Sequence, residues 1–401
     1  MKDVLGFISD QRFHRTFTLP PNPDTGRDKP HRFSYADFGD PDSNAVVFFC
    51  GALMATRVCY SPLDQLAHAC NVRIIHVDRP GNGGSDTVEA EKRIQTFLEM
   101  VPQLLEHLRI PYISLASHSG GDIYLLNIML TYPYLLHPAR PYVCFFAPWV
   151  HPTHSKITQM QATSMLPAPM IGQYASIARF VNANVIPLVG LSGSLIHGTM
   201  GSWRSAPGPI SLTPTPTRSR APSISSPSDY AGPNLDDPTV VEELRKFITK
   251  ILFAESMDGI SADAQLFMRK PRSIPWCSPS LHWSDINYAV PLLSKIIAED
   301  VRLDGHNRTW VIETFHAESD NMVGNRGREW FDSCWIPGRV STSSNNRCSD
   351  ESRPSVSDPS YEYRSEIVKG TDHNFLLDPS FGASEVWLRR VRDAFPMPEE
   401  V

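Results

Sequence analysis

The chain has 401 residues, a hydrophobic fraction of 41%, a charged fraction of 20% and a formal net charge of −6. This apolar content is sufficient for a sizeable core, and the acidic net charge and the lack of a Lys/Arg stripe argue against a nucleic-acid-binding surface. Seven cysteines at irregular spacing predict reduced thiols rather than a disulfide framework. No secretory leader is visible and no apolar run is long enough to span a bilayer, so we expect a cytoplasmic protein without a membrane span. Nothing in the composition indicates an oligomeric state.

The first part of the chain alternates short apolar runs with segments of helical spacing. Two strands are expected at residues 12–19 and 32–37, on either side of a Pro- and Asn-rich turn. Four apolar runs of strand length follow, at residues 45–50, 72–77, 112–116 and 142–146. Strands that are apolar on both faces are typical of a sheet covered by helices on both sides. Their alternation with helices predicts an α/β fold with a mostly parallel central sheet.

The helix expected between the second and third of these runs contains a proline. Apolar residues recur at three- and four-residue spacing from Ile94 to Leu108, which indicates an amphipathic helix. Pro102 lies inside the pattern, and proline removes a backbone donor. We therefore predict a kink here, or two shorter helices.

The pattern changes after residue 150. A segment rich in Met, Ile and Ala leads into a Ser- and Pro-rich stretch at about residues 199–236, which we predict to be disordered. Helical spacing resumes after Asp237, and strand character returns at residues 309–315 and 361–368. A second Ser- and Pro-rich insertion, also predicted to be disordered, separates these strands at about residues 339–360. A final amphipathic helix is expected near the end of the chain.

The sequence Ser117-His118-Ser119-Gly120-Gly121 directly follows the apolar run at 112–116. A buried strand that ends in small-X-Ser-X-small and opens into a helix is the sequence form of a nucleophile elbow. The turn is so sharp that large side chains two positions from the serine would collide with neighbouring backbone. Ser117 stands where glycine is usual, and serine is also small. We predict Ser119 as a nucleophile.

An alcohol nucleophile needs a base, a carboxylate that orients the base, and donors for the oxyanion. His373 is the predicted base because its loop follows the last strand, at the sheet edge where Ser119 lies. Asp320, after the strand at 309–315, is the predicted acid, with Glu318 as the alternative. The oxyanion hole is expected to use the backbone N–H groups of Gly120 and Ala52, with Leu53 in place of Ala52 as the alternative. No metal site and no cofactor are predicted.

These motifs together resemble the α/β-hydrolase superfamily, in its branch of esterases, haloperoxidases and epoxide hydrolases. The resemblance rests on residues 50–52, the Asp-Arg-Pro-Gly-X-Gly-X-Ser loop at residues 78–85, the elbow, Asp320 and residues 370–373. It implies the α/β-hydrolase fold and the chain order nucleophile, acid, base. Epoxide hydrolases and haloalkane dehalogenases of this branch have Asp as nucleophile, so Ser119 argues against both activities. Cys50 is a departure, since the family often has His there.

The resemblance also implies a domain organisation and an activity. Residues 1–150 and 298–401 would form the core, and residues 151–297 an inserted helical cap over the serine. We expect a serine hydrolase that cleaves an ester or thioester of a small, apolar acyl substrate through an acyl-enzyme. Two alternatives stay open: an acyltransferase, C–C hydrolase or cyclase on the same triad, or a non-catalytic ligand-binding relative.

Overall fold

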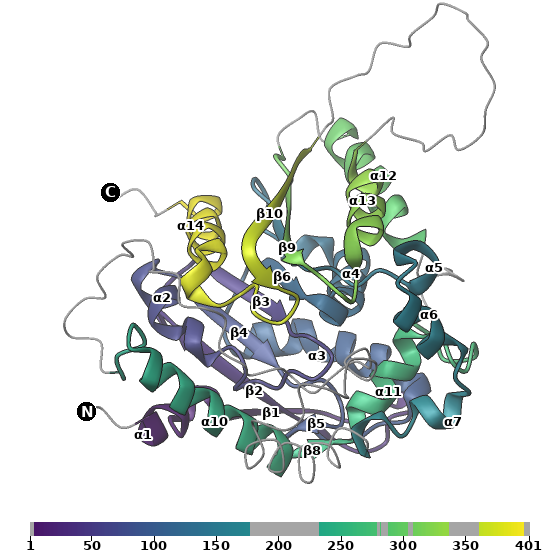
Figure 1. Cartoon of the computed structure of the whole chain (residues 1–401), viewed down its shortest axis with the longest axis horizontal. Helices are drawn as coiled ribbons and strands as arrows, with labels where there is room; N and C mark the ends of the chain where they lie inside the picture. Colours follow the sequence, from purple (N-terminus) through teal and green to yellow (C-terminus); the bar gives the residue numbers. More distant parts are fainter. Residues whose placement is uncertain are drawn as a thin grey trace, which may run out of the picture.

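The structure is a computed structural model that describes residues 4–176, 232–278, 281, 288–303, 308–336 and 361–396. Its strands are β1 (Arg15–Leu19), β2 (His31–Gly39), β3 (Val46–Cys50), β4 (Arg73–Val77), β5 (Asn82–Gly83), β6 (Ser114–His118), β7 (Tyr142–Phe146), β8 (Ser256–Met257), β9 (Val311–Ser319) and β10 (Glu362–Asp372). Its α-helices are α1 (Val4–Ile8), α2 (Asp64–Ala69), α3 (Arg93–His107), α4 (Asp122–Thr131), α5 (Pro152–Ser155), α6 (Thr158–Met165), α7 (Ala168–Ile171), α10 (Pro238–Ala254), α11 (Asp258–Phe267), α12 (Ala289–Leu303), α13 (Gly324–Trp335) and α14 (Ala383–Ala394). Helices cover a central sheet on both sides (Figure 1).

The central sheet has eight strands in the order β1-β2-β4-β3-β6-β7-β9-β10. The strands from β4 to β10 pair in parallel, whereas β2 is antiparallel to both β1 and β4. The prediction of a mostly parallel α/β sheet is therefore confirmed. Because β6, β7, β9 and β10 are parallel neighbours, their carboxyl ends lie at one edge of the sheet.

Alternating side chains of the strands enter two apolar cores. Phe48 of β3 packs on the side of α3, α4, α12 and α13, and its neighbour Phe49 packs on the side of α1, α2, α10 and α14. Both phenylalanines are buried. A strand between two helical layers needs apolar residues at consecutive positions, which explains the unbroken apolar runs in the sequence.

Helix α3 excludes one of the two predicted forms. It is a single helix from Arg93 to His107 with Pro102 inside it, not two shorter helices. Its apolar face, which includes Phe97, Val101 and Leu104, is fully covered by the sheet side of the core. Burial of several large side chains contributes about 1.5–3 kcal/mol each, which exceeds the roughly 3 kcal/mol that a helical proline costs.

The segment between β7 and β9 divides into parts with different neighbours. Helices α5, α6, α7 and α11 gather on one side of the molecule, and α10 lies beside α1 on the other (Figure 1). Helix α12 packs on α13 and continues across residue 298, where the sequence suggested a boundary. Most of the insertion expected at 199–236, and all of that at 339–360, lie outside the described residues.

Helices of the described ranges are too short or too polar to cross a bilayer.

Candidate active site

The turn between β6 and α4 has the geometry of a nucleophile elbow. Strand β6 ends at His118, Ser119 has a φ of +53°, and α4 begins three residues later. A positive φ is strained for a non-glycine residue and marks a constrained site. A Cβ on Gly121 would lie 2.0 Å from the carbonyl oxygen of Cys50. Only glycine therefore allows α4 to begin this close to the end of β3.

Ser119, His373 and Asp320 form a continuous line of hydrogen bonds. The Ser119 Oγ lies 2.8 Å from Nε2 of His373, and Nδ1 of the same ring lies 2.8 Å from Oδ2 of Asp320. Ser119 and His373 are both buried. This is the order of contacts that a serine nucleophile, its base and the orienting carboxylate require.

Asp320 is held as a carboxylate by its surroundings. Its Oδ1 accepts hydrogen bonds of 2.8 Å from the N–H groups of Met322 and Val323. Burial by itself raises the pKa of Asp320, but the charge and hydrogen bond of His373 and the two N–H donors together lower it to about 2. Asp320 is therefore ionised at neutral pH and can stabilise a protonated His373.

Glu318, the alternative acid, has a different partner. Its Oε2 accepts a hydrogen bond of 2.8 Å from the N–H of Gly370. Glu318 is exposed and braces the loop before His373. The structure thus places Asp320, and not Glu318, against the imidazole.

The backbone loop after β3 does not present the N–H of Ala52 as expected. That N–H donates to Oη of Tyr60 at 3.0 Å. Since an amide nitrogen can only donate, the Tyr60 hydroxyl accepts here and directs its own hydrogen to Nδ1 of His118, 3.0 Å away. Ala52 is therefore already engaged. The neighbouring Leu53 N–H has no hydrogen-bond partner among the described residues.

His118 connects this loop to the base. With Nδ1 accepting from Tyr60, its hydrogen is on Nε2, which donates to the main-chain oxygen of His373 at 2.8 Å. Burial, and to a smaller extent the charge of His373, lowers the pKa of His118 to about 4. The ring is neutral at pH 7, which this arrangement requires. Sequence reasoning missed Tyr60 and the ring of His118, because neither contact follows from local spacing.

Apolar side chains border the elbow. A Cβ on Gly120 would lie 2.2 Å from the Phe267 ring, so this ring of α11 rests directly on the residue after the nucleophile. The Phe267 and Trp149 rings are 6.0 Å apart. Leu53 and Met54 belong to an apolar cluster with Ile260 of the same helix.

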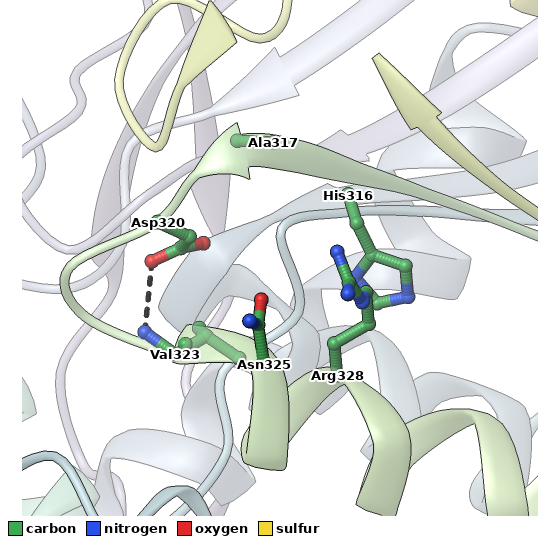
Figure 2. A pocket seen from close by; sticks show the side chains of 7 residues that line it. His316, Ala317, Asp320, Val323, Asn325 and Arg328 are labelled. Carbon is green, nitrogen blue, oxygen red and sulfur yellow. Dashed lines mark hydrogen bonds between the residues drawn. The ribbon is translucent and has the colours of Figure 1, made fainter. Parts of the chain in front are cut away.

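A small pocket lies beside Asp320, on the α13 side of β9 (Figure 2). It is lined by His316, Asp320, Asn325 and Arg328 among others, and its volume is about 10 Å³. A single water needs on the order of 10–15 Å³. This pocket is therefore too small for a substrate. In the described parts of the chain, no three His, Cys, Asp or Glu side chains come together as a metal site.

No family model and no curated protein matches the chain in sequence. Solved structures do match it. A loop variant of a haloalkane dehalogenase from Bradyrhizobium elkanii is 12% identical, with a TM-score of 0.51 over 95% of this chain and 98% of the other. Epoxide hydrolase A from Mycobacterium thermoresistibile is 14% identical, with a TM-score of 0.50 over 96% and 100%.

The chain has the α/β-hydrolase fold. In this fold, ligands and catalytic groups gather at the carboxyl ends of parallel strands. Ser119 follows β6, Asp320 follows β9 and His373 follows β10. The α/β-hydrolase sheet of this protein therefore brings together three side chains that are up to 254 residues apart in sequence.

Proposed function

We propose that the protein is a serine hydrolase that cleaves esters or thioesters through an acyl-enzyme, with Ser119 as nucleophile, His373 as base and Asp320 as orienting acid. The observation that carries this proposal is the hydrogen-bonded line from Ser119 Oγ through His373 to Asp320. The residues of this line come from the ends of β9 and β10 and from the strained turn after β6. A serine with this partner is activated as a nucleophile.

The mechanism follows from the direction of each hydrogen bond. His373 Nε2 takes the Ser119 proton as Oγ attacks the carbonyl carbon, and Asp320 stabilises the imidazolium that forms. The proton then passes from Nε2 to the leaving group. Water, deprotonated by His373, attacks the acyl-enzyme and releases the acid.

The oxyanion is held by backbone donors in this proposal. Gly120 N–H supplies one because it directly follows the nucleophile. Leu53 N–H supplies the other, since the N–H of Ala52 is engaged by Tyr60. These donors stabilise the charge that develops in the transition state.

The proposed substrate is a small molecule with an apolar acyl group. Phe267 of α11 rests on Gly120, the neighbour of Ser119, and its ring lies 6.0 Å from that of Trp149. Leu53 and Met54 cluster with Ile260 of the same helix, and we expect these side chains to supply the apolar surface of the site. Helices α5, α6, α7 and α11, which gather on one side of the molecule (Figure 1), would act as the cap. An apolar acyl chain gains about 0.8 kcal/mol per buried methylene in such a site.

A fluorophosphonate probe tests the proposal directly. The folded protein should form one covalent adduct, located on Ser119 by peptide mass analysis, and Ser119→Ala should form none. In a panel of p-nitrophenyl esters from acetate to octanoate, kcat/KM should rise with chain length. Absence of a Ser119 adduct in folded protein would exclude the serine-nucleophile mechanism. A clear preference for acetate would exclude the apolar acyl site alone.

A further inference from the structure

Arg79 of the loop after β4 makes an unusual set of contacts with the loop after β3. Its two terminal nitrogens donate to three consecutive carbonyl oxygens, those of Gly51, Ala52 and Leu53. The distances to Ala52 and Leu53 are both 2.8 Å. Arg79 is 3% exposed. A buried guanidinium, with its donors in a rigid fork, thus holds the loop that carries the second proposed oxyanion donor.

The carbonyl contacts decide where the N–H groups point. In a trans peptide, the C=O of one residue and the N–H of the next point in opposite directions. With the Gly51 oxygen on Arg79, the Ala52 N–H points away from Arg79, and it meets Tyr60 there. With the Ala52 oxygen on Arg79, the Leu53 N–H must also point away from it. Arg79 therefore determines the direction of the proposed donor without touching the substrate.

The surroundings of Arg79 also carry positive charge. Its Nε pairs with Asp263 of α11 at 2.7 Å, and the same carboxylate pairs with Arg93 at 2.7 Å. Tyr124 donates a further hydrogen bond to Asp263. Two guanidinium groups thus share one carboxylate in a buried cluster. A positive group on a peptide carbonyl polarises that peptide and strengthens its N–H as a donor.

Helix α11 is connected to both proposed oxyanion donors. Asp263 holds Arg79, and Phe267, one turn later, rests on Gly120. Residues four apart lie on one face of a helix, so a single face of α11 supports both. Helix α11, which belongs to the inserted segment, therefore supports the residues that carry both proposed oxyanion donors.

We propose that Arg79 is the positioning residue of the oxyanion hole, anchored by Asp263 of α11: it orients the peptides of residues 51–53 and strengthens the Leu53 N–H donor. This inference rests on the proposed function, and it adds a dependence of catalysis on a contact 184 residues distant in sequence.

Arg79→Met and Arg93→Met form a matched pair for the test. Each removes one guanidinium from Asp263, but only Arg79→Met withdraws donors from the loop, since Arg93 otherwise donates to Pro80. With a p-nitrophenyl ester, and turnover corrected for the folded fraction, Arg79→Met should lower kcat about 10- to 100-fold with KM nearly unchanged. Arg93→Met should change kcat by no more than about threefold. Arg79→Lys, which keeps the charge but lacks the fork, should lie in between and serves if Arg79→Met does not fold.

Two further readouts separate positioning from general loss of structure. Binding of an alkyl trifluoromethyl ketone, whose adduct needs the oxyanion hole, should weaken in parallel with kcat, whereas binding of the product acid should not. Amide hydrogen exchange of residues 51–56 should accelerate in Arg79→Met and not in Arg93→Met. Equal kcat losses in the matched pair, or unchanged exchange in this loop, would overturn the inference. Failure of the unaltered protein to react with fluorophosphonate would instead overturn the proposed function, and the exchange comparison would still decide the role of Arg79.

Discussion

Among the residues that the structure describes, two buried histidines each pair with an aspartate. His373 lies 2.8 Å from Asp320, and His316 of β9 lies 2.9 Å from Asp332 of α13. Both histidines are buried. The two pairs differ in their remaining partners: Ser119 Oγ meets the second nitrogen of His373, whereas Tyr363 and Ser365 donate to Asp332.

The difference lies in what each His–Asp pair contacts beyond itself. Asp332 of α13 accepts hydrogen bonds from one side chain of β9 and two of β10, and it therefore ties these three elements together. Asp320 accepts hydrogen bonds from two backbone N–H groups, and the imidazole of His373 is its side-chain partner. The strained turn at Ser119 is what distinguishes the His373 pair, because it presents a hydroxyl to the free nitrogen.

The two histidines should respond very differently to replacement. If His373 is the base that we propose, His373→Gln should lower kcat on the order of 10⁶-fold, because Ser119 is no longer activated. His316→Gln should retain most of the activity of its folded fraction. Steady-state kinetics on a p-nitrophenyl ester measure both. Comparable losses in the two variants would contradict the separation of roles.

The two aspartates offer a matched test of the same comparison. Asp320→Asn should lower kcat about 10⁴-fold, since an amide cannot stabilise the imidazolium and favours the wrong tautomer. Asp332→Asn removes a carboxylate with a similar histidine contact, and it should mainly lower the free energy of unfolding. Denaturant unfolding and kinetics on the same samples separate the effects. Near-normal turnover of Asp320→Asn would leave Glu318 as the acid to examine.

The two aspartates should also differ in how much they contribute to the pH dependence of the unfolding free energy. The folded pKa of Asp320 is lowered to about 2 by its partners in spite of burial, and that of an unfolded aspartate is about 3.9. A lowered folded pKa stabilises the fold above the unfolded pKa and ceases to do so as pH falls through the folded pKa. We expect about 2–3 kcal/mol of unfolding free energy to be lost through Asp320 between about pH 5 and pH 1, with most of the loss between pH 4 and 2.

The measurement is denaturant unfolding at a series of pH values in this window. Asp320→Asn should flatten the pH dependence between pH 4 and 2. Asp332, whose pKa is lowered by its hydrogen bond to His316 although burial opposes this, should contribute less. An unchanged slope in Asp320→Asn would contradict the assigned carboxylate environment.

The smallest expected effect on kcat comes from replacing Tyr60 or His118, which support the main chain of His373. Tyr60→Phe removes the hydroxyl between Ala52 N–H and His118, and His118 holds the main chain of His373. Loss of one hydrogen bond contributes about 0.5–1.5 kcal/mol, so kcat should fall about tenfold or less with little change in KM. Rates for Tyr60→Phe and His118→Gln should fall together, because they interrupt one chain of contacts. An unchanged kcat in both would show that this chain does not position the base.

The comparison also shows how much of the site could be predicted. Ser119, Asp320 and His373 each follow a predicted strand, and parallel strands end at one edge of a sheet, so the order of predicted strands indicated where the three residues lie. The structure places them in hydrogen-bond contact. Asp332 and His316 drew no prediction, since nothing local marks a helix residue as the partner of a strand residue.

The sequence by itself determined the alternation of buried strands and helices, the sharp turn at Ser119 and the small residues that the turn requires. These depend on periodicity and backbone sterics, which are local. Only the tertiary structure decided that Pro102 lies within one helix, that Ala52 donates to Tyr60, and that Asp263 anchors Arg79. Such contacts join residues far apart in the chain, and their free energy depends on burial and on the partners that packing supplies.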